Sequence, residues 1–211
     1  MRQTLIATGI VYLLLTCSAY AQAWTSYISR EDRFTTWFPG EPTISDTEWV
    51  DEIGRTRPAR KYAAEWFGNT YTLIAVDISE ADFTLRRGSY YYAAKVWREK
   101  GNVVYDAWAQ LDRIPGHKLM MELDDGRRIY FSSFVEGDRL YILESNVSHN
   151  SPPPGQFDQG LQIFDEEGVR IRYSQTGQRI IRTDDLHETL GGPDYDGPIL
   201  EGQSDEYYFP E

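Results

Sequence analysis

Residues 119–147 read LMMELDDGRRIYFSSFVEGDRLYILESNV, three largely apolar runs separated by two short polar turns. In the first run Leu119, Met121 and Leu123 alternate with other residues, the period of a strand with one buried face. The turns, Asp-Asp-Gly and Glu-Gly-Asp, favour tight hairpins because Gly accepts a positive φ at little cost. The stretch therefore predicts three consecutive antiparallel strands.

Further β signals lie toward the N-terminus. Residues 34–38 are aromatic and β-branched, and the run stops at Pro-Gly-Glu-Pro, where two prolines fix φ and interrupt a ladder. Residues 43–50 and 57–65 flank a polar turn, which predicts a hairpin. Residues 70–76 are apolar enough for a central strand, and 103–111 predicts another.

Two helices are predicted between and after these strands. Residues 90–100 contain no Gly or Pro, with Ser89 as the expected N-cap, and residues 82–88 fit either a loop or an earlier turn of this helix. Phe157, Leu161 and Phe164 form the stripe of a short second helix that should end near Gly168. Residues 114–117, Ile-Pro-Gly-His, are expected to break the strand pattern.

Both ends of the chain differ from the middle in composition. Arg2, an apolar run over 5–15 and Ala-Gln-Ala at 21–23 form the three parts of a secretory signal peptide, so cleavage is predicted after Ala23. The alternative is a lipoprotein anchored through Cys17, but the preceding Thr departs from the small residue usual there. A single α+β domain is predicted over 24–182, followed by an acidic and disordered tail over 183–211.

The charge pattern excludes several classes of partner. The chain of 211 residues has a formal net charge of −12, and nine of its 33 acidic residues lie in 184–211, a segment with no Lys or Arg. Binding to nucleic acid or to anionic lipid needs clustered positive charge, so neither is expected. The mature chain should not insert stably into a membrane, because no later apolar stretch reaches spanning length.

Sequence patterns of catalysis are absent. There is no nucleophile elbow, phosphate-binding loop, dinucleotide fingerprint or zinc helix, so we expect no catalytic residues, no metal and no cofactor. His117, His149 and His187 have no His partner at helical or strand spacing and are interpreted as solvated surface side chains. Acidic runs at 124–125 and 165–167 lack the alternating spacing of a calcium loop.

A candidate partner surface is formed by aromatic and proline residues. Three consecutive tyrosines, including Tyr90 and Tyr91, point in different directions around a helix, so one face cannot bury them all. Pro152, Pro153 and Pro154 form a stiff connector that cannot be helix or central strand. We take these five residues as the expected contact surface; the alternative for the tyrosines is packing at the boundary of the core.

Asp32-Arg33-Phe34 followed by Phe-Pro-Gly-Glu-Pro at 38–42 resembles the start of a group of bacterial exported proteins. The run 139–143, the proline loop and Arg-Ile-Arg-Tyr at 170–173 look like the end of the same domain. The layout of these proteins is similar to the PsbP/Mog1-like sandwich, an antiparallel sheet with helices packed against it. The resemblance implies an α+β fold over about 24–173 and an accessory or adaptor role, and it carries over no site residues. The order of predicted elements also favours a mostly antiparallel α+β fold with two short helices.

Three functions remain open from the sequence. The first is an exported, non-enzymatic accessory protein, periplasmic or secreted, that binds a protein partner in the bacterial envelope. The second is a small-ligand or metal-binding module with a pocket between sheet and helix. The third is a hydrolase whose site is assembled from distant segments around His117 or His149. Neither the partner's identity nor the oligomeric state follows from the sequence.

Overall fold

The computed structural model describes residues 24–181, which contain ten strands and two helices. In chain order the elements are β1 (Thr25–Ser29), β2 (Phe34–Phe38), β3 (Thr43–Val50), β4 (Thr56–Trp66), β5 (Asn69–Asp77), α2 (Phe83–Arg98), β6 (Asn102–Leu111), β7 (Ile114–Glu122), β8 (Arg128–Glu136), β9 (Arg139–Val147), α3 (Gly155–Gln159) and β10 (Gln162–Ile163). The predicted signal peptide, Cys17 and the predicted tail over 183–211 lie outside this range.

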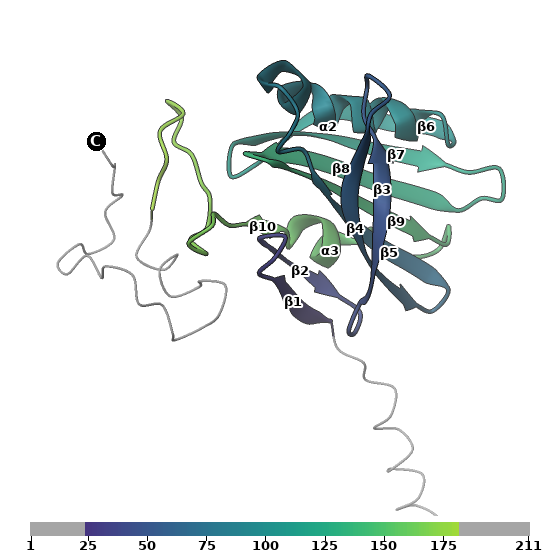
Figure 1. Cartoon of the computed structure of the whole chain (residues 1–211). Helices are drawn as coiled ribbons and strands as arrows, with labels where there is room; N and C mark the ends of the chain where they lie inside the picture. The colour runs from purple at the N-terminus through teal and green to yellow at the C-terminus, as the bar shows by residue number, and fades with distance from the viewer. Residues whose placement is uncertain (1–23, 182–211) are drawn as a thin grey trace, which may run out of the picture.

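The strands form two sheets, and every paired strand is antiparallel to its neighbour. The larger sheet has the order β3-β4-β5-β9-β8-β7-β6, and the smaller one the order β1-β2-β10. Figure 1 shows α2 and the small sheet on opposite sides of the large one. The prediction of an α+β fold with a mostly antiparallel sheet and two helices is confirmed, including the β7-β8-β9 meander over 119–147.

Helix α2 covers one face of the large sheet, over β7, β8 and β9. Of the two alternatives for residues 82–88, the earlier turn of the helix is the one that forms. The predicted N-cap at Ser89 is wrong: the N-cap is Asp82, whose side chain accepts a hydrogen bond from the Leu85 amide at 3.0 Å. Ala93 and Ala94 are fully buried, and their small side chains let the helix lie close to the strands. Trp97 packs beside them and donates a hydrogen bond to Glu144 at 2.6 Å.

The small sheet and α3 cover the opposite face, where the core is rich in aromatic rings. Phe34 of β2 is fully buried and contacts Tyr62 of β4 edge to face, with ring centroids 4.9 Å apart. Phe38 contacts Phe157 of α3 at 5.1 Å. Strand β10 completes the layer because Ile163 lies opposite Phe34 in β2. This layer therefore joins segments from both ends of the described chain.

The predicted break at 114–117 is wrong. The chain turns earlier, at Asp112 and Arg113, which both have a positive φ, and β7 already starts at Ile114. Gly116 does not end the strand, because it is needed within it. A Cβ at that position would collide with the Phe134 ring and with the carbonyl oxygen of Ser133.

The second helix is shorter than its apolar stripe suggested. Helix α3 ends at Gln159, and its C-cap is Gly160. A side chain at position 160 has no room, because a Cβ there would collide with the Trp37 ring and with the carbonyl oxygen of Gln156. Leu161 and Phe164 are buried as expected, but they flank β10 instead of continuing the helix.

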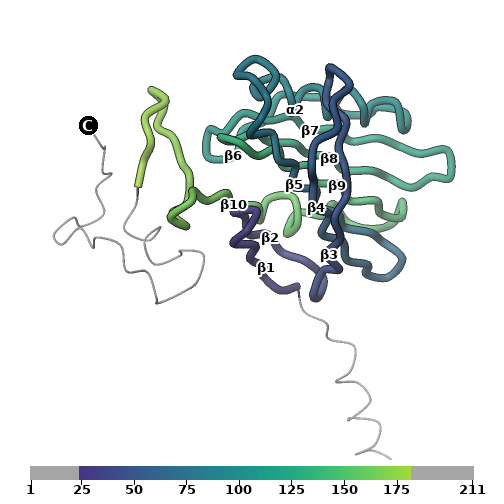
Figure 2. Tube along the Cα trace, viewed as in Figure 1, coloured from purple at the N-terminus to yellow at the C-terminus, as the bar shows by residue number. Residues whose placement is uncertain are grey.

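Beyond β10 the chain still contacts the domain, because Ile171 is buried in the core and Arg170 pairs with Asp112. Figure 2 shows the last part of the described chain as a hairpin that extends away from the two sheets.

The Asp32-Arg33-Phe34 turn ties the small sheet to the large one. The Asp32 carboxylate accepts hydrogen bonds from the Tyr62 hydroxyl at 2.5 Å and from Arg60 at 3.2 Å. Arg33 has a positive φ and forms an ion pair with Asp138 in the β8–β9 turn. The motif that prompted the family resemblance is thus a structural clamp.

Candidate functional site

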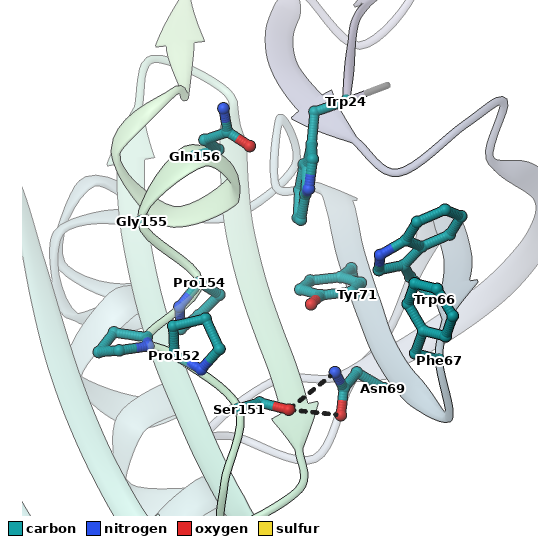
Figure 3. A pocket seen from close by; sticks show the side chains of 11 residues that line it. Trp24, Trp66, Phe67, Asn69, Tyr71, Ser151, Pro152, Pro154, Gly155 and Gln156 are labelled. Carbon is teal, nitrogen blue, oxygen red and sulfur yellow. Dashed lines mark hydrogen bonds between the residues drawn. The ribbon is translucent and has the colours of Figure 1, made fainter. Parts of the chain in front are cut away.

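The proline loop lies beside a groove on the face of the large sheet that carries the small sheet. Pro152 and Pro153 are exposed and Pro154 is buried, and the loop leads directly into α3. Across the groove lies the turn that joins β4 to β5. The groove has a volume of about 480 Å³, and Figure 3 shows its lining residues, which are Trp24, Trp66, Phe67, Asn69, Tyr71, Ser151, Pro152, Pro153, Pro154, Gly155 and Gln156.

Hydrogen bonds fix the distance between the two walls of the groove. The Asn69 side chain donates to the Ser151 hydroxyl at 3.0 Å and accepts from the Ser148 amide at 2.9 Å. Because Asn69 starts β5 while Ser148 and Ser151 follow β9, these bonds hold the proline loop against the β4–β5 turn. The groove is therefore formed before any ligand arrives.

The β4–β5 turn displays aromatic rings. Phe67 has φ 48° and the following Gly68 has φ 73°. A bulky residue rarely adopts a positive φ, because its Cβ crowds the backbone. In this conformation the Phe67 side chain is 78% exposed, and its ring packs edge to face on Trp66 at 4.5 Å.

Trp24 and Tyr71 form the inner part of the groove. Their rings meet edge to face at 5.0 Å, and Tyr71 also contacts Phe157 of α3. Burial raises the pKa of Tyr71, against a smaller opposite effect of its hydrogen bond with Asn69, so the hydroxyl stays neutral. The lining contains no Asp, Glu, Lys or Arg. The groove offers aromatic faces and neutral polar groups to whatever enters it.

Tyr90 and Tyr91 lie on the other face of the large sheet, so the structure does not bring them together with the proline loop. They pack against Trp108 of β6. The Tyr91 and Trp108 rings are stacked at 5.4 Å with an interplanar angle of 12°, and Tyr90 meets Trp108 edge to face at 5.8 Å. Trp108 is 67% exposed and Tyr91 is 45% exposed, whereas Tyr90 is half-buried. The predicted surface is therefore two separate surfaces.

The interpretation of His117 as a solvated side chain is wrong. It lies within β7 and is 2% exposed, with its Nε2 atom 2.5 Å from Asp106 Oδ1 and 3.0 Å from Arg98 Nη2. The hydrogen bond from Arg98 lowers the pKa of Asp106 to about 2. His149 is exposed, as predicted, and its carbonyl oxygen accepts a hydrogen bond from Arg128. His187 lies outside the described residues.

A second, smaller pocket of about 220 Å³ surrounds the Asp32 clamp and is lined by charged side chains, among them Arg60, Asp77 and Arg139. Arg139 lies 3.3 Å from Asp77 and 3.1 Å from Asp138, so these charges are already paired. Within residues 24–181, no group of three or more His, Cys, Asp or Glu side chains is placed to hold a metal ion. In the same range, no helix has the length and apolarity needed to cross a membrane.

Sequence reasoning missed the aromatic residues that complete both surfaces. Trp24, Trp66 and Phe67 surround the proline loop, and Trp108 lies beside the tyrosines. A usable signal was the pair Trp66-Phe67 directly before the turn at Gly68-Asn69, because a turn exposes side chains that a strand would bury. Trp24 and Trp108 gave no such signal.

The fold and the groove describe an α+β protein with a neutral, open binding groove. No protein-family model matches the sequence, and no curated protein matches it. Among solved structures, the chain is similar to the solution structure of cyanobacterial PsbP (CyanoP) from Synechocystis sp. PCC 6803. The TM-score is 0.47 and the identity 10%, over 68% of this chain and 94% of that one. The likeness concerns the layout alone and assigns no site residue.

Proposed function

We propose that this chain is an exported, non-enzymatic accessory protein that binds a protein partner in the bacterial envelope, and that the groove is its binding site. The observation that carries the proposal is an open groove of about 480 Å³ in which four aromatic rings face three prolines and no charged side chain. Exposed aromatic side chains in a preformed hollow are typical anchors of protein recognition. Export by the predicted signal peptide is part of the same proposal.

The chemistry of the groove indicates what kind of segment would bind. Aromatic-lined grooves accept proline-rich or otherwise extended segments, which lose little entropy on binding. The absence of charge from the lining favours an uncharged segment, because a charged side chain would lose its water without gaining an opposite charge. We therefore expect a neutral stretch of the partner that carries proline or aromatic residues.

Site-specific photo-crosslinking in cells tests this proposal. A photoreactive aromatic amino acid replaces Phe67, which lies in the groove, or Phe83, which lies at the start of α2 on the other face. The two side chains are 78% and 71% exposed, so they are matched in accessibility. We expect a discrete crosslinked protein from position 67 and none from position 83. The same bands from both positions, or none from position 67, would contradict the proposal.

A small-ligand site in the same groove is the second candidate. The volume of the groove, about 480 Å³, lies within the range of about 300–1,000 Å³ that is usual for small-molecule pockets. Asn69, Ser151 and Gln156 supply polar groups among the aromatic rings. A ligand that binds only the folded state must raise the melting temperature. A rise that is seen for one class of metabolite and is lost in Trp66→Ala would favour this candidate. If no compound changes the melting temperature, the small-ligand candidate is contradicted and partner binding remains the only proposal for the groove.

A further inference from the structure

The outer edge of β6 is a second surface, independent of the groove. Strand β6 ends the large sheet, and no strand within residues 24–181 pairs with its outer side. It is ten residues long, and its exposed apolar side chains include Val104, Tyr105 and Trp108. Figure 1 shows the strand at the margin of the sheet, beside α2. A long, apolar and unpaired edge is a template for another strand.

The charges around this edge are already neutralised. Asp106 is the only charged residue of β6, and Arg98 of α2 donates two hydrogen bonds to its carboxylate, at 2.5 and 2.9 Å. The Arg98 guanidinium also lies over the Tyr91 ring, 5.1 Å from its centroid, and Tyr91 stacks on Trp108. The aromatic rings are thus held in place before any contact forms, which lowers the entropy that binding would cost.

The opposite edge of the same sheet is built differently. Strand β3 carries Asp46 and Glu48, and the Asp46 carboxylate is 95% exposed. Charged side chains on an edge strand discourage pairing with another chain. Strand β6 has a single charged residue, which Arg98 pairs, and one irregularity, a register shift against β7 between Val103 and Tyr105. Of the two edges of the large sheet, β6 is therefore less protected by charge than β3.

Charge also indicates which strand would fit the β6 edge. A charged segment finds no opposite charge there, so the edge suits a neutral and apolar strand, and β6 itself has that composition. Two copies of a chain with a net charge of −12 repel each other in general. At β6 the local contribution to that repulsion is small, because its single carboxylate is paired with Arg98.

We propose that β6 pairs antiparallel with β6 of a second copy of this chain about a two-fold axis, which joins the two large sheets into one. A two-fold axis presents the same patch from both copies, and antiparallel pairing continues the order of every other strand in the sheet. Tyr91 and Trp108 of each copy flank the junction. The groove on the other face stays open in the dimer, so the two surfaces act separately.

Sedimentation equilibrium of the full chain over a range of concentrations tests the dimer. Val104→Lys places a charge on the edge, and Ile44→Lys places the same charge on β3; the two side chains are matched at 50% and 47% exposed. We expect a reversible dimer whose dissociation constant rises at least about tenfold in Val104→Lys. Ile44→Lys should dimerise like the unmodified chain.

Three results would overturn the proposal: a monomer at every concentration, a dimer unaffected by Val104→Lys, or a dimer weakened equally by Ile44→Lys. Circular dichroism establishes that each variant is folded. If Val104→Lys does not fold, Tyr105→Lys replaces it, because this side chain is exposed on the same strand. Trp108→Ala should also raise the dissociation constant, because it removes the stacked aromatic contact.

Discussion

A single helix of sixteen residues, α2, covers one face of the large sheet. The other face is covered by four separate elements, β1, β2, α3 and β10. The first cover is made by one continuous segment. The second needs residues separated by more than a hundred positions, such as Thr35 and Gln162, which lie opposite each other in β2 and β10. The two candidate surfaces also lie one on each face: the outer edge of β6, with Trp108 stacked on Tyr91, adjoins α2, and the groove adjoins α3.

The comparison shows how a face assembled from distant segments is held together. Its core is aromatic, and its buried polar groups are satisfied across segment boundaries: the Tyr141 hydroxyl of β9 donates to the Asp32 carbonyl oxygen at 2.9 Å, and the Thr36 hydroxyl of β2 to the Phe157 carbonyl oxygen at 2.8 Å. The α2 face combines small and aliphatic side chains with a smaller aromatic group in which Trp97 contacts Trp49 and Phe131. We therefore expect the assembled face to respond to single changes in its polar clamp as well as in its core.

The largest effect should come from Phe34→Ala. The ring is fully buried between the two sheets, so its removal leaves a cavity that costs about 4 kcal/mol of the free energy of unfolding. Urea denaturation followed by circular dichroism measures it, with Ile28→Ala of the same hairpin, which is half exposed, expected to cost less than about 1 kcal/mol. We expect one cooperative transition. A two-step transition in which α2 outlasts the small sheet would show that the two faces are stabilised separately.

An intermediate effect should come from Asp32→Asn. The change removes the charge that Arg60 and the Tyr62 hydroxyl face, and we expect a loss of about 2 kcal/mol. The control is Asp46→Asn, which alters an exposed carboxylate 3.7 Å from the same Arg60 and should cost less than about 0.5 kcal/mol. If Asp32→Asn and Asp46→Asn lose the same free energy of unfolding, burial of the Asp32 carboxylate does not strengthen its interaction with Arg60.

The smallest effect should be the pH dependence that Asp106 contributes on the α2 side. The hydrogen bond from Arg98 lowers the pKa of Asp106 to about 2 in the folded chain, against about 3.9 in an unfolded one. The stabilisation is therefore present above pH 4 and is lost as the pH falls toward 2. Because the Asp106 carboxylate is one-third exposed, solvent screening should keep its contribution to the free energy of unfolding below about 1 kcal/mol.

Urea denaturation of Asp106→Asn between pH 2 and pH 7 measures this contribution. The variant should be less stable than the unmodified chain at pH 7 and equal to it near pH 2. Asp124→Asn, in the exposed β7–β8 turn, controls for the loss of one negative charge. If the difference in free energy of unfolding between Asp106→Asn and the unmodified chain is the same from pH 2 to pH 7, titration of Asp106 is not its source.

Elements with local signals could be predicted from the sequence, and those set by distant contacts could not. The β7-β8-β9 meander was predicted because its turns contain Gly and its strands alternate. The start of β7 was missed because Asp112 and Arg113 adopt positive φ without the Gly or Asn that usually marks such a turn. The role of Gly116 depends on Phe134, a contact to the next strand.

The candidate site followed the same rule. The proline loop and the tyrosines stood out by composition, so some residues of each surface could be named from the sequence. Other segments supply residues that complete them. Trp24, just before β1, reaches the groove by packing on Tyr71 of β5, and Trp108 reaches Tyr91 because β6 follows α2 back along the sheet. The buried position of His117 depended on the missed start of β7.

The Asp32-Arg33-Phe34 clamp also orders the events of folding. Arg33 binds Asp138, and Phe34 lies opposite Ile163 of β10, so the first hairpin of the domain lacks its partners until nearly the whole domain has been synthesised. Contacts of such long sequence separation form slowly, because the chain must first lose the entropy of a large loop. The helix α2 and the hairpins from β6 to β9 can form without that delay. We therefore expect the domain to close from its middle outward, with its N-terminal strands docking last.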